Sequence, residues 1–134
     1  MTAFVRFNLV GVAGFAVQLG TLSALYAAGM PVALATGLAV EAAILHNFMW
    51  HERWTWAGQV TGTRAQRLAR FHVSNGLISI AGNALLTTGL VQAGAPLVLA
   101  NLAAVLTCAL LNYASAILWV FCAKTWPTVH GHLQ

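Results

Sequence analysis

The sequence predicts an all-α integral membrane protein whose four transmembrane helices form two helical-hairpin repeats of parallel topology. The first observation is composition, because 60% of the 134 residues are hydrophobic and only 6% are charged, whereas a soluble domain carries about 25% charged residues. The second is the presence of four apolar stretches, each close to the length that crosses a bilayer. The third is an internal repeat that relates the two halves of the chain. Together they exclude a soluble globule and a disordered chain.

The four spans are delimited by glycine and proline. The first pair is separated by Gly29-Met30-Pro31 and the second by Gly94-Ala95-Pro96. Glycine just after a helix end and proline at the start of the next helix are typical of short turns. Each pair is therefore predicted to be a hairpin, and residues 1–134 a single membrane domain. The expected spans are Phe7 to Ala28, Val32 to Trp50, Phe71 to Ala93 and Leu97 to Phe121.

All the cations fall on one side of this predicted bundle. The positive-inside rule then places both termini and the loop at about 51–70 in the cytoplasm. Arg64 and Arg67 are expected on a short amphipathic segment at the interface, leading into the third span. The tail at 124–134 is expected to be mobile, and its His130-x-His132 pattern is too weak to predict a metal site. The six cations are Arg6, Arg53, Arg64, Arg67, Arg70 and Lys124.

The internal repeat is most specific where polar and aromatic residues recur. Asn47-Phe48 corresponds to Asn112-Tyr113, and Trp54-Thr55-Trp56 corresponds to Trp119-Val120-Phe121. The first repeat covers about residues 4–56 and the second about 70–121. Transporters are often built from such duplicated units, with the substrate path at the repeat interface.

A short motif at the end of the second span carries a family resemblance. The motif reads Asn47-Phe48-Met49-Trp50-His51-Glu52-Arg53-Trp54-Thr55-Trp56, and Phe4-Val5-Arg6-Phe7 with Gly11 opens the chain. With the weaker second copy, these residues make the sequence similar to the GtrA-like family of small four-span membrane proteins, from about Phe4 to Phe121. His51 stands where that family usually has Asn, and Glu52 where it has Arg.

The resemblance implies transport and no enzyme activity. Such a protein is expected in the bacterial cytoplasmic (inner) membrane, as a flippase-like translocator of polyprenyl-phosphate-linked sugar, such as undecaprenyl-phosphate glucose, in cell-surface polysaccharide synthesis. One alternative is an accessory membrane protein that anchors or recruits a glycosyltransferase. Another is a small proton-coupled multidrug-type transporter. Such transporters are expected to carry their membrane glutamate in the first span, whereas Glu41 lies in the second. Neither a cofactor nor a metal is expected, and a homo-oligomer is left open.

Net charge does not point to nucleic acid. The formal charge is +4, but six dispersed cations in an apolar chain form no basic stripe. The expected partners are therefore the lipid-linked sugar, membrane lipid and a glycosyltransferase, with no nucleic acid.

Inside the spans, polar residues group at one predicted depth. By the helical rise of 1.5 Å per residue, Glu41 lies about 15 Å from the Pro31 turn and Gln18 about 17 Å from the cytoplasmic start of the first span. Asn83 lies at a similar level. A carboxyl group at mid-membrane is costly and normally faces a partner or a water-filled path. Glu41 is interpreted either as a proton-coupling or hydroxyl-binding group, or as a structural hydrogen-bonding group to Gln18 or another helix.

A second polar group lies near the cytoplasmic ends of the spans. Arginine forks match phosphate oxygens, and amides can bind sugar hydroxyls. The alternative is that interfacial arginines only set topology and contact anionic lipid. The candidate substrate-binding residues are Arg6, Gln18, Glu41, Asn47, Arg53, Arg70, Asn83 and Asn112.

Overall fold

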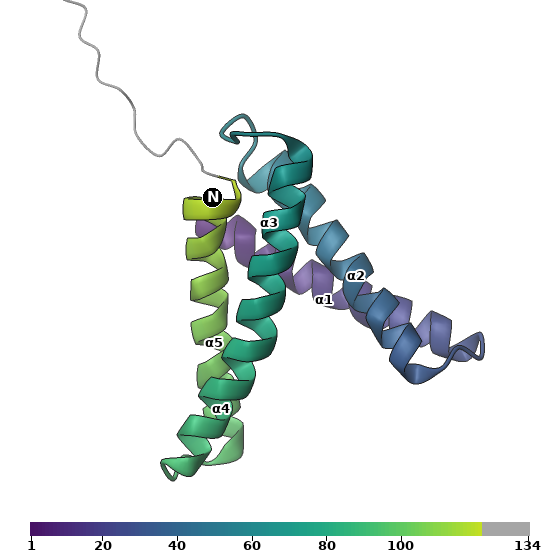
Figure 1. Cartoon of the computed structure of the whole chain (residues 1–134), viewed down its shortest axis with the longest axis vertical. Coiled ribbons are helices and arrows are strands. Elements are labelled where there is room, and N and C mark those ends of the chain that lie inside the picture. The colour runs from purple at the N-terminus through teal and green to yellow at the C-terminus, as the bar shows by residue number, and fades with distance from the viewer. Residues whose placement is uncertain (122–134) are drawn as a thin grey trace, which may run out of the picture.

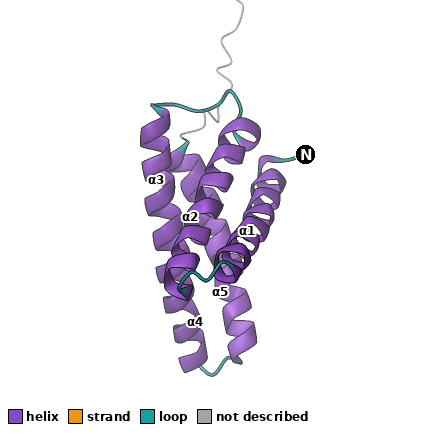
Figure 2. Cartoon of the chain, turned by 90° about the vertical axis from the view of Figure 1, so that its right-hand side faces the viewer, coloured by secondary structure: helices purple, strands orange, loops and turns teal. Residues whose placement is uncertain are grey.

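The computed structural model describes residues 1–121, and in this range every regular element is helical (Figure 2). The predicted all-α membrane fold is confirmed. Within residues 1–121, three helices are long and apolar enough to cross a membrane: Ala3–Ala27, Val32–Thr55 and Leu97–Val120. The predicted tail at 124–134 lies outside the described residues. The elements are α1 (Ala3–Ala27), α2 (Val32–Trp50), η1 (His51–Thr55), α3 (Arg64–Leu77), η2 (Ile78–Gly82), α4 (Asn83–Gln92), α5 (Leu97–Ser115) and η3 (Ala116–Val120), where η marks a π-helix.

The helix that contains the third predicted span is longer than that span. It begins at Arg64, two turns before the predicted Phe71, and continues through α3, η2 and α4 to Gln92. The predicted amphipathic segment with Arg64 and Arg67 therefore forms the first part of this helix and leads into the third span without a break. Its start is stabilised by a capping box, in which Thr63 Oγ1 accepts from the Gln66 backbone and Gln66 Oε1 accepts from the Thr63 backbone.

Both hairpin turns use one backbone device. Gly29 and Gly94 adopt φ values of 85° and 94°, in the left-handed region that favours glycine. The next residue in each turn then donates its backbone N–H to a carbonyl near the end of the preceding helix, at 3.1 Å for Met30 to Leu25 and at 3.0 Å for Ala95 to Leu90. These bonds satisfy carbonyls that the helix leaves open.

Within each hairpin the helices approach closely along small residues. Ala35 and Ala39 on α2 are fully buried, and Ala100 and Ala104 on α5 are at most 1% exposed. Alanine at a helix interface lets backbones pack closely in a membrane, where dispersion and not the hydrophobic effect holds helices together. The α1–α2 and α4–α5 pairs are therefore the tightly packed units of the fold.

The two hairpins meet at one end and diverge towards the other (Figure 1). We call the joined end, which carries Arg6, Arg53, Arg64, Arg67 and Arg70, the arginine end, and the other the turn end. No Cα atom of α4 lies within 8 Å of α1 or α2 in the described chain. At the arginine end the hairpins share one buried cluster, formed by Phe7, Phe48, Trp56, Phe71, Ala116, Val120 and Phe121.

Candidate functional site

A cleft lies between the two hairpins. It consists of a cavity of about 340 Å³ towards the arginine end and one of about 530 Å³ deeper along the helices. Both cavities are lined by Gly11, Phe15, Asn47, Asn75 and Val105, so we treat them as one space and call it the inter-hairpin cleft. Its polar lining residues are Asn8, Gln18, Asn47, His51, Asn75, Ser79 and Asn112.

Several amides in the cleft are not used by the fold. Asn75 and Gln18 have no side-chain hydrogen bond to any residue in 1–121, and neither has a fully buried polar atom. Asn47 accepts from His46 Nδ1 at 3.2 Å through its Oδ1 atom, and its NH₂ group has no hydrogen-bond partner among residues 1–121. Amides between apolar spans need partners, because the surrounding lipid supplies none. Water or ligand hydroxyls in the cleft can fill that role.

Asn47 occupies its place because α1 has no side chain there. A Cβ atom built on Gly14 would lie 2.0 Å from Asn47 Oδ1. The glycine therefore lets the amide sit directly against the backbone of α1. This contact was not anticipated from the sequence, although Gly14 faces the helix that carries the signature asparagine.

His51 is a polar lining residue that sequence analysis did not select. Its side chain is 2% exposed and packs between rings, stacked on Phe7 with centroids 4.4 Å apart and edge-on to Phe71. Its Nδ1 atom bonds Thr55 Oγ1 at 3.0 Å, and its Nε2 atom has no partner within the described residues. The sequence signal that could have identified His51 is that it stands where the family usually has Asn.

The second asparagine of the repeat, Asn112, is held more firmly than the first. Its Nδ2 atom donates to Ser79 Oγ at 3.1 Å, and its Oδ1 atom is buried without a partner in the described chain. Asn83, another candidate, donates to the Ser79 carbonyl of its own span at 2.7 Å and does not line the cleft. Of these two candidates, only Asn112 reaches the cleft.

Arg6 and Arg70 do not line the cleft. Each donates through Nη1 to a backbone carbonyl at 3.1 Å, Arg6 to Trp54 and Arg70 to Trp119. The Arg6 guanidinium also lies 5.7 Å from the centre of the Trp54 ring, within the range of a cation–π contact. Each arginine therefore donates to a backbone carbonyl near the C-terminal end of the π-helix in its own hairpin. Arg53 is exposed.

Glu41 and Gln18 do not meet, although the helical rise puts them at one predicted depth. Gln18 lines the cleft, whereas the Glu41 carboxylate accepts from His72 Nε2 of α3 at 3.0 and 2.9 Å, outside the cleft. Counting residues assumes parallel spans, but the hairpins are tilted relative to each other (Figure 1). Glu41 therefore bonds a residue of another helix, His72 of α3, and not Gln18.

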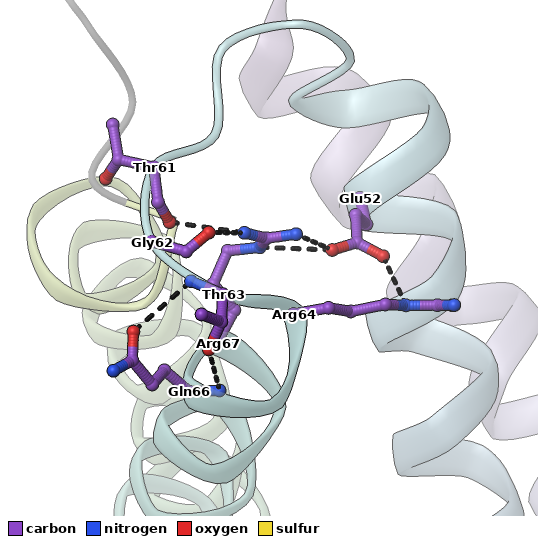
Figure 3. A network of polar contacts seen from close by, with 7 residues as sticks. All are labelled: Glu52, Thr61, Gly62, Thr63, Arg64, Gln66 and Arg67. Carbon is purple, nitrogen blue, oxygen red and sulfur yellow. Dashed lines mark hydrogen bonds and ion pairs between the residues drawn. The ribbon is translucent and has the colours of Figure 1, made fainter.

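The other acid, Glu52, joins the hairpins at the arginine end (Figure 3). Its carboxylate bonds Arg67 through Nε at 3.0 Å and also through Nη2, and bonds Arg64 Nε at 2.8 Å. Arg67 donates further to the carbonyls of Thr61 and Gly62. Arg67 is buried, so Glu52 neutralises a charge inside the protein. The sequence placed these residues at the interface and did not predict their pairing.

The described residues contain no group of three or more His, Cys, Asp or Glu side chains able to hold a metal ion. The cleft itself is lined by amides, one imidazole, one hydroxyl group and aromatic rings, and by no charged side chain. Such a lining suits an uncharged polar ligand bound by hydrogen bonds.

Comparison with known proteins decides the family. The profile described as the GtrA/DPMS transmembrane domain matches residues 6–121. The chain belongs to this family. A relative named dolichol-phosphate mannosyltransferase, from Pyrococcus furiosus, is 37% identical over 70 residues, which are 52% of this chain and 20% of the relative. This GtrA/DPMS protein therefore spans only a small part of that relative's length.

Family membership and this relative place the GtrA/DPMS protein among membrane proteins related to lipid-linked sugars. Within its structure, three of the eight candidate residues line the inter-hairpin cleft: Gln18, Asn47 and Asn112. The other five lie outside it, at the π-helix ends, on the outer face or within the second hairpin: Arg6, Glu41, Arg53, Arg70 and Asn83.

Proposed function

We propose that this protein moves a polyprenyl-phosphate-linked sugar from one leaflet of the membrane to the other. The observation that carries the proposal is the inter-hairpin cleft, in which Gln18, Asn47 and Asn75 offer amide atoms that have no hydrogen-bond partner among residues 1–121. Polar groups inside a membrane domain mark ligand pathways when no protein partner satisfies them. In duplicated transporter folds the substrate site lies between the repeats, as this cleft does.

The shape of the fold supports a lipid-attached substrate. Because α4 does not approach α1 or α2, the hairpins are separated at the turn end, and the space between them is bounded by apolar residues such as Phe15 and Ile80. A polyprenyl chain can remain in lipid beside such an opening while its headgroup enters the polar cleft. The arginines at the joined end set the starting side, which the positive-inside rule makes cytoplasmic.

Translocation is tested with purified protein in liposomes that contain a short-chain polyprenyl-phosphate glucose or mannose. We expect the protein alone to speed the appearance of the sugar on the opposite leaflet, and Asn75→Leu to reduce the rate at least tenfold. Asn101→Leu is the matched control, because Asn101 bonds Thr87 and lies outside the cleft. No flux above that of empty liposomes, with either sugar, would refute the proposal.

A second candidate function is that of an accessory protein for a glycosyltransferase. It is favoured by the fact that the match to the Pyrococcus protein, whose name denotes a mannosyltransferase, covers only 20% of that protein. In this case the membrane domain anchors or recruits a separate enzyme. Sugar transfer that requires this protein, together with no flux from the protein alone, would favour this function over translocation.

A further inference from the structure

The cleft offers uncharged polar groups, whereas the positive charges of the arginines lie outside it. No charged side chain lines the inter-hairpin cleft. Arg6 and Arg70, which the sequence suggested for binding phosphate, donate instead to the carbonyls of Trp54 and Trp119. An anion taken into an apolar surrounding without a cation partner is strongly disfavoured. The phosphate of a lipid-linked sugar therefore has no suitable site within the cleft.

A sugar ring, in contrast, matches the lining. Its hydroxyl groups both donate and accept hydrogen bonds, and amides do the same. Asn47 offers NH₂ donors, and Asn75 offers both its oxygen and its NH₂ group. Phe7 and Phe15 supply apolar walls to the same cavity. Sites for small polar ligands commonly combine aromatic walls with a few placed polar groups.

His51 is the most firmly placed of these polar groups. Thr55 Oγ1 holds its Nδ1 atom at 3.0 Å, and the Phe7 ring lies parallel to the imidazole within 10°. The ring is therefore fixed in orientation before any ligand arrives, and its second nitrogen, Nε2, is left for a ligand. Preorganised groups discriminate best, since a ligand that fails to pair with them leaves a buried polar atom unsatisfied.

We propose that the end of the cleft formed by His51, Asn47 and Asn75 is a subsite for the uncharged glycosyl group, and that His51 Nε2 determines its specificity by bonding a sugar hydroxyl. The phosphate stays outside this subsite. The proposal rests on the proposed function, because it names the part of the lipid-linked sugar that the cleft binds.

The test compares three lipids of one chain length bound to the full chain in nanodiscs: polyprenyl-phosphate glucose, polyprenyl-phosphate mannose and the polyprenyl phosphate without sugar. We expect the wild type to bind at least one sugar-bearing lipid about tenfold more tightly than the bare phosphate, which corresponds to about one net hydrogen bond. Equal binding of all three lipids would overturn the subsite.

Two variants separate a binding role of His51 from a packing role. His51→Phe keeps an aromatic ring between Phe7 and Phe71 and removes Nε2, so the preference for the sugar should disappear while binding of the bare phosphate stays within twofold. Should this variant fail to fold, Asn75→Ala gives the same readout, because the Asn75 side chain has no partner in residues 1–121. Asn101→Ala is the matched control and should retain the full preference.

The outcomes distinguish this inference from the proposed function. A sugar preference that survives both His51→Phe and Asn75→Ala would overturn the subsite, whatever the liposome assay shows. Translocation of all three lipids at one rate would support a flippase and refute sugar recognition by the cleft. A preference that the variants abolish, without any flux in liposomes, would retain the subsite and reject translocation.

Discussion

The two hairpins share the devices that build them. In each, an arginine at the start of the first span donates to the carbonyl of a tryptophan near the end of the second, Arg6 to Trp54 and Arg70 to Trp119. The π-helices that carry these tryptophans, His51–Thr55 and Ala116–Val120, occupy equivalent places 65 residues apart. Both turns contain a glycine with positive φ. Duplication has therefore retained the backbone geometry of the hairpin.

The hairpins differ in the side chains that face the cleft. Asn47 of the first packs against Gly14, which offers it no hydrogen bond, whereas the equivalent Asn112 donates to Ser79, the residue equivalent to Gly14. One amide is therefore left available to a ligand, and the other is held by its own hairpin. The two halves therefore build the cleft together but contribute to it unequally.

The largest expected effect comes from making the end of the first hairpin like that of the second. Glu52 corresponds to Ile117, so Glu52→Ile removes the partner of Arg67, whose side chain is 9% exposed. Breaking a buried pair from one side costs about 3–5 kcal/mol. We expect a loss of that size in the free energy of unfolding, measured by denaturant titration of helical circular dichroism in detergent micelles.

Two controls sharpen this result. Arg64→Ala removes the other cation, whose side chain is 61% exposed, and should cost at most about 1 kcal/mol. The double variant Glu52→Ile with Arg67→Met should recover part of the loss, because it leaves no unpaired charge. A cost below about 1 kcal/mol for Glu52→Ile alone would show that the pair does not join the hairpins.

The Glu52–Arg67 pair also marks the limit of sequence-based prediction. The spans and turns were predictable, because apolar length and the Gly-x-Pro pattern are local features. The pairing of Glu52 with Arg67 and of Glu41 with His72 depends on how the hairpins tilt, which is a tertiary property. The start of the third helix at Arg64, two turns before the predicted span at Phe71, is another feature that apolar length did not give. The first turns of this helix contain arginines and are not apolar. One of these arginines, Arg67, is neutralised by the distant Glu52 carboxylate, which apolar length cannot reveal.

The candidate site was predictable only in part. Asn47, Asn112 and Gln18 were selected and line the cleft. Arginine chemistry favoured a phosphate role for Arg6 and Arg70, but a guanidinium is equally suited to a backbone carbonyl. Their bonds to Trp54 and Trp119 become visible only when the π-helix ends are placed. Residue type alone cannot distinguish these uses.

The second prediction concerns the unequal amides. Gly14→Ala places a Cβ atom 2.0 Å from Asn47 Oδ1, so the amide must rotate and lose its bond to His46. We expect a loss of about 2 kcal/mol in unfolding free energy from overpacking, and a loss of sugar-lipid binding in nanodiscs. Gly20→Ala is the control, since nothing lies within 4 Å of its Cβ position. Equal effects of the two variants would contradict the role given to Gly14.

The third prediction tests the device that both hairpins share. Arg6→Met removes the bond to the Trp54 carbonyl and the contact with the Trp54 ring. We expect a loss of about 1.5 kcal/mol in unfolding free energy, at the lower end for a hydrogen bond of a charged group, because Arg6 Nε already lacks a partner in the described chain. Binding of the bare polyprenyl phosphate should stay within twofold. A tenfold weaker binding would instead assign Arg6 to the phosphate.

The smallest expected effect comes from Ser79→Ala, which removes the bond that holds Asn112. Hydrogen bonds between membrane helices contribute about 0.6 kcal/mol on average, so the unfolding free energy should fall by about that amount. Ser23→Ala is the matched control, as Ser23 has no side-chain hydrogen bond within residues 1–121. The informative measurement is sugar-lipid binding. Because Ser79→Ala releases the Asn112 amide into the cleft, as Gly14 leaves the Asn47 amide, binding should be retained or tightened. Weaker binding, comparable to that of Asn75→Ala, would mean that the Asn112–Ser79 pair itself contacts the ligand, and the two halves would then contribute equally.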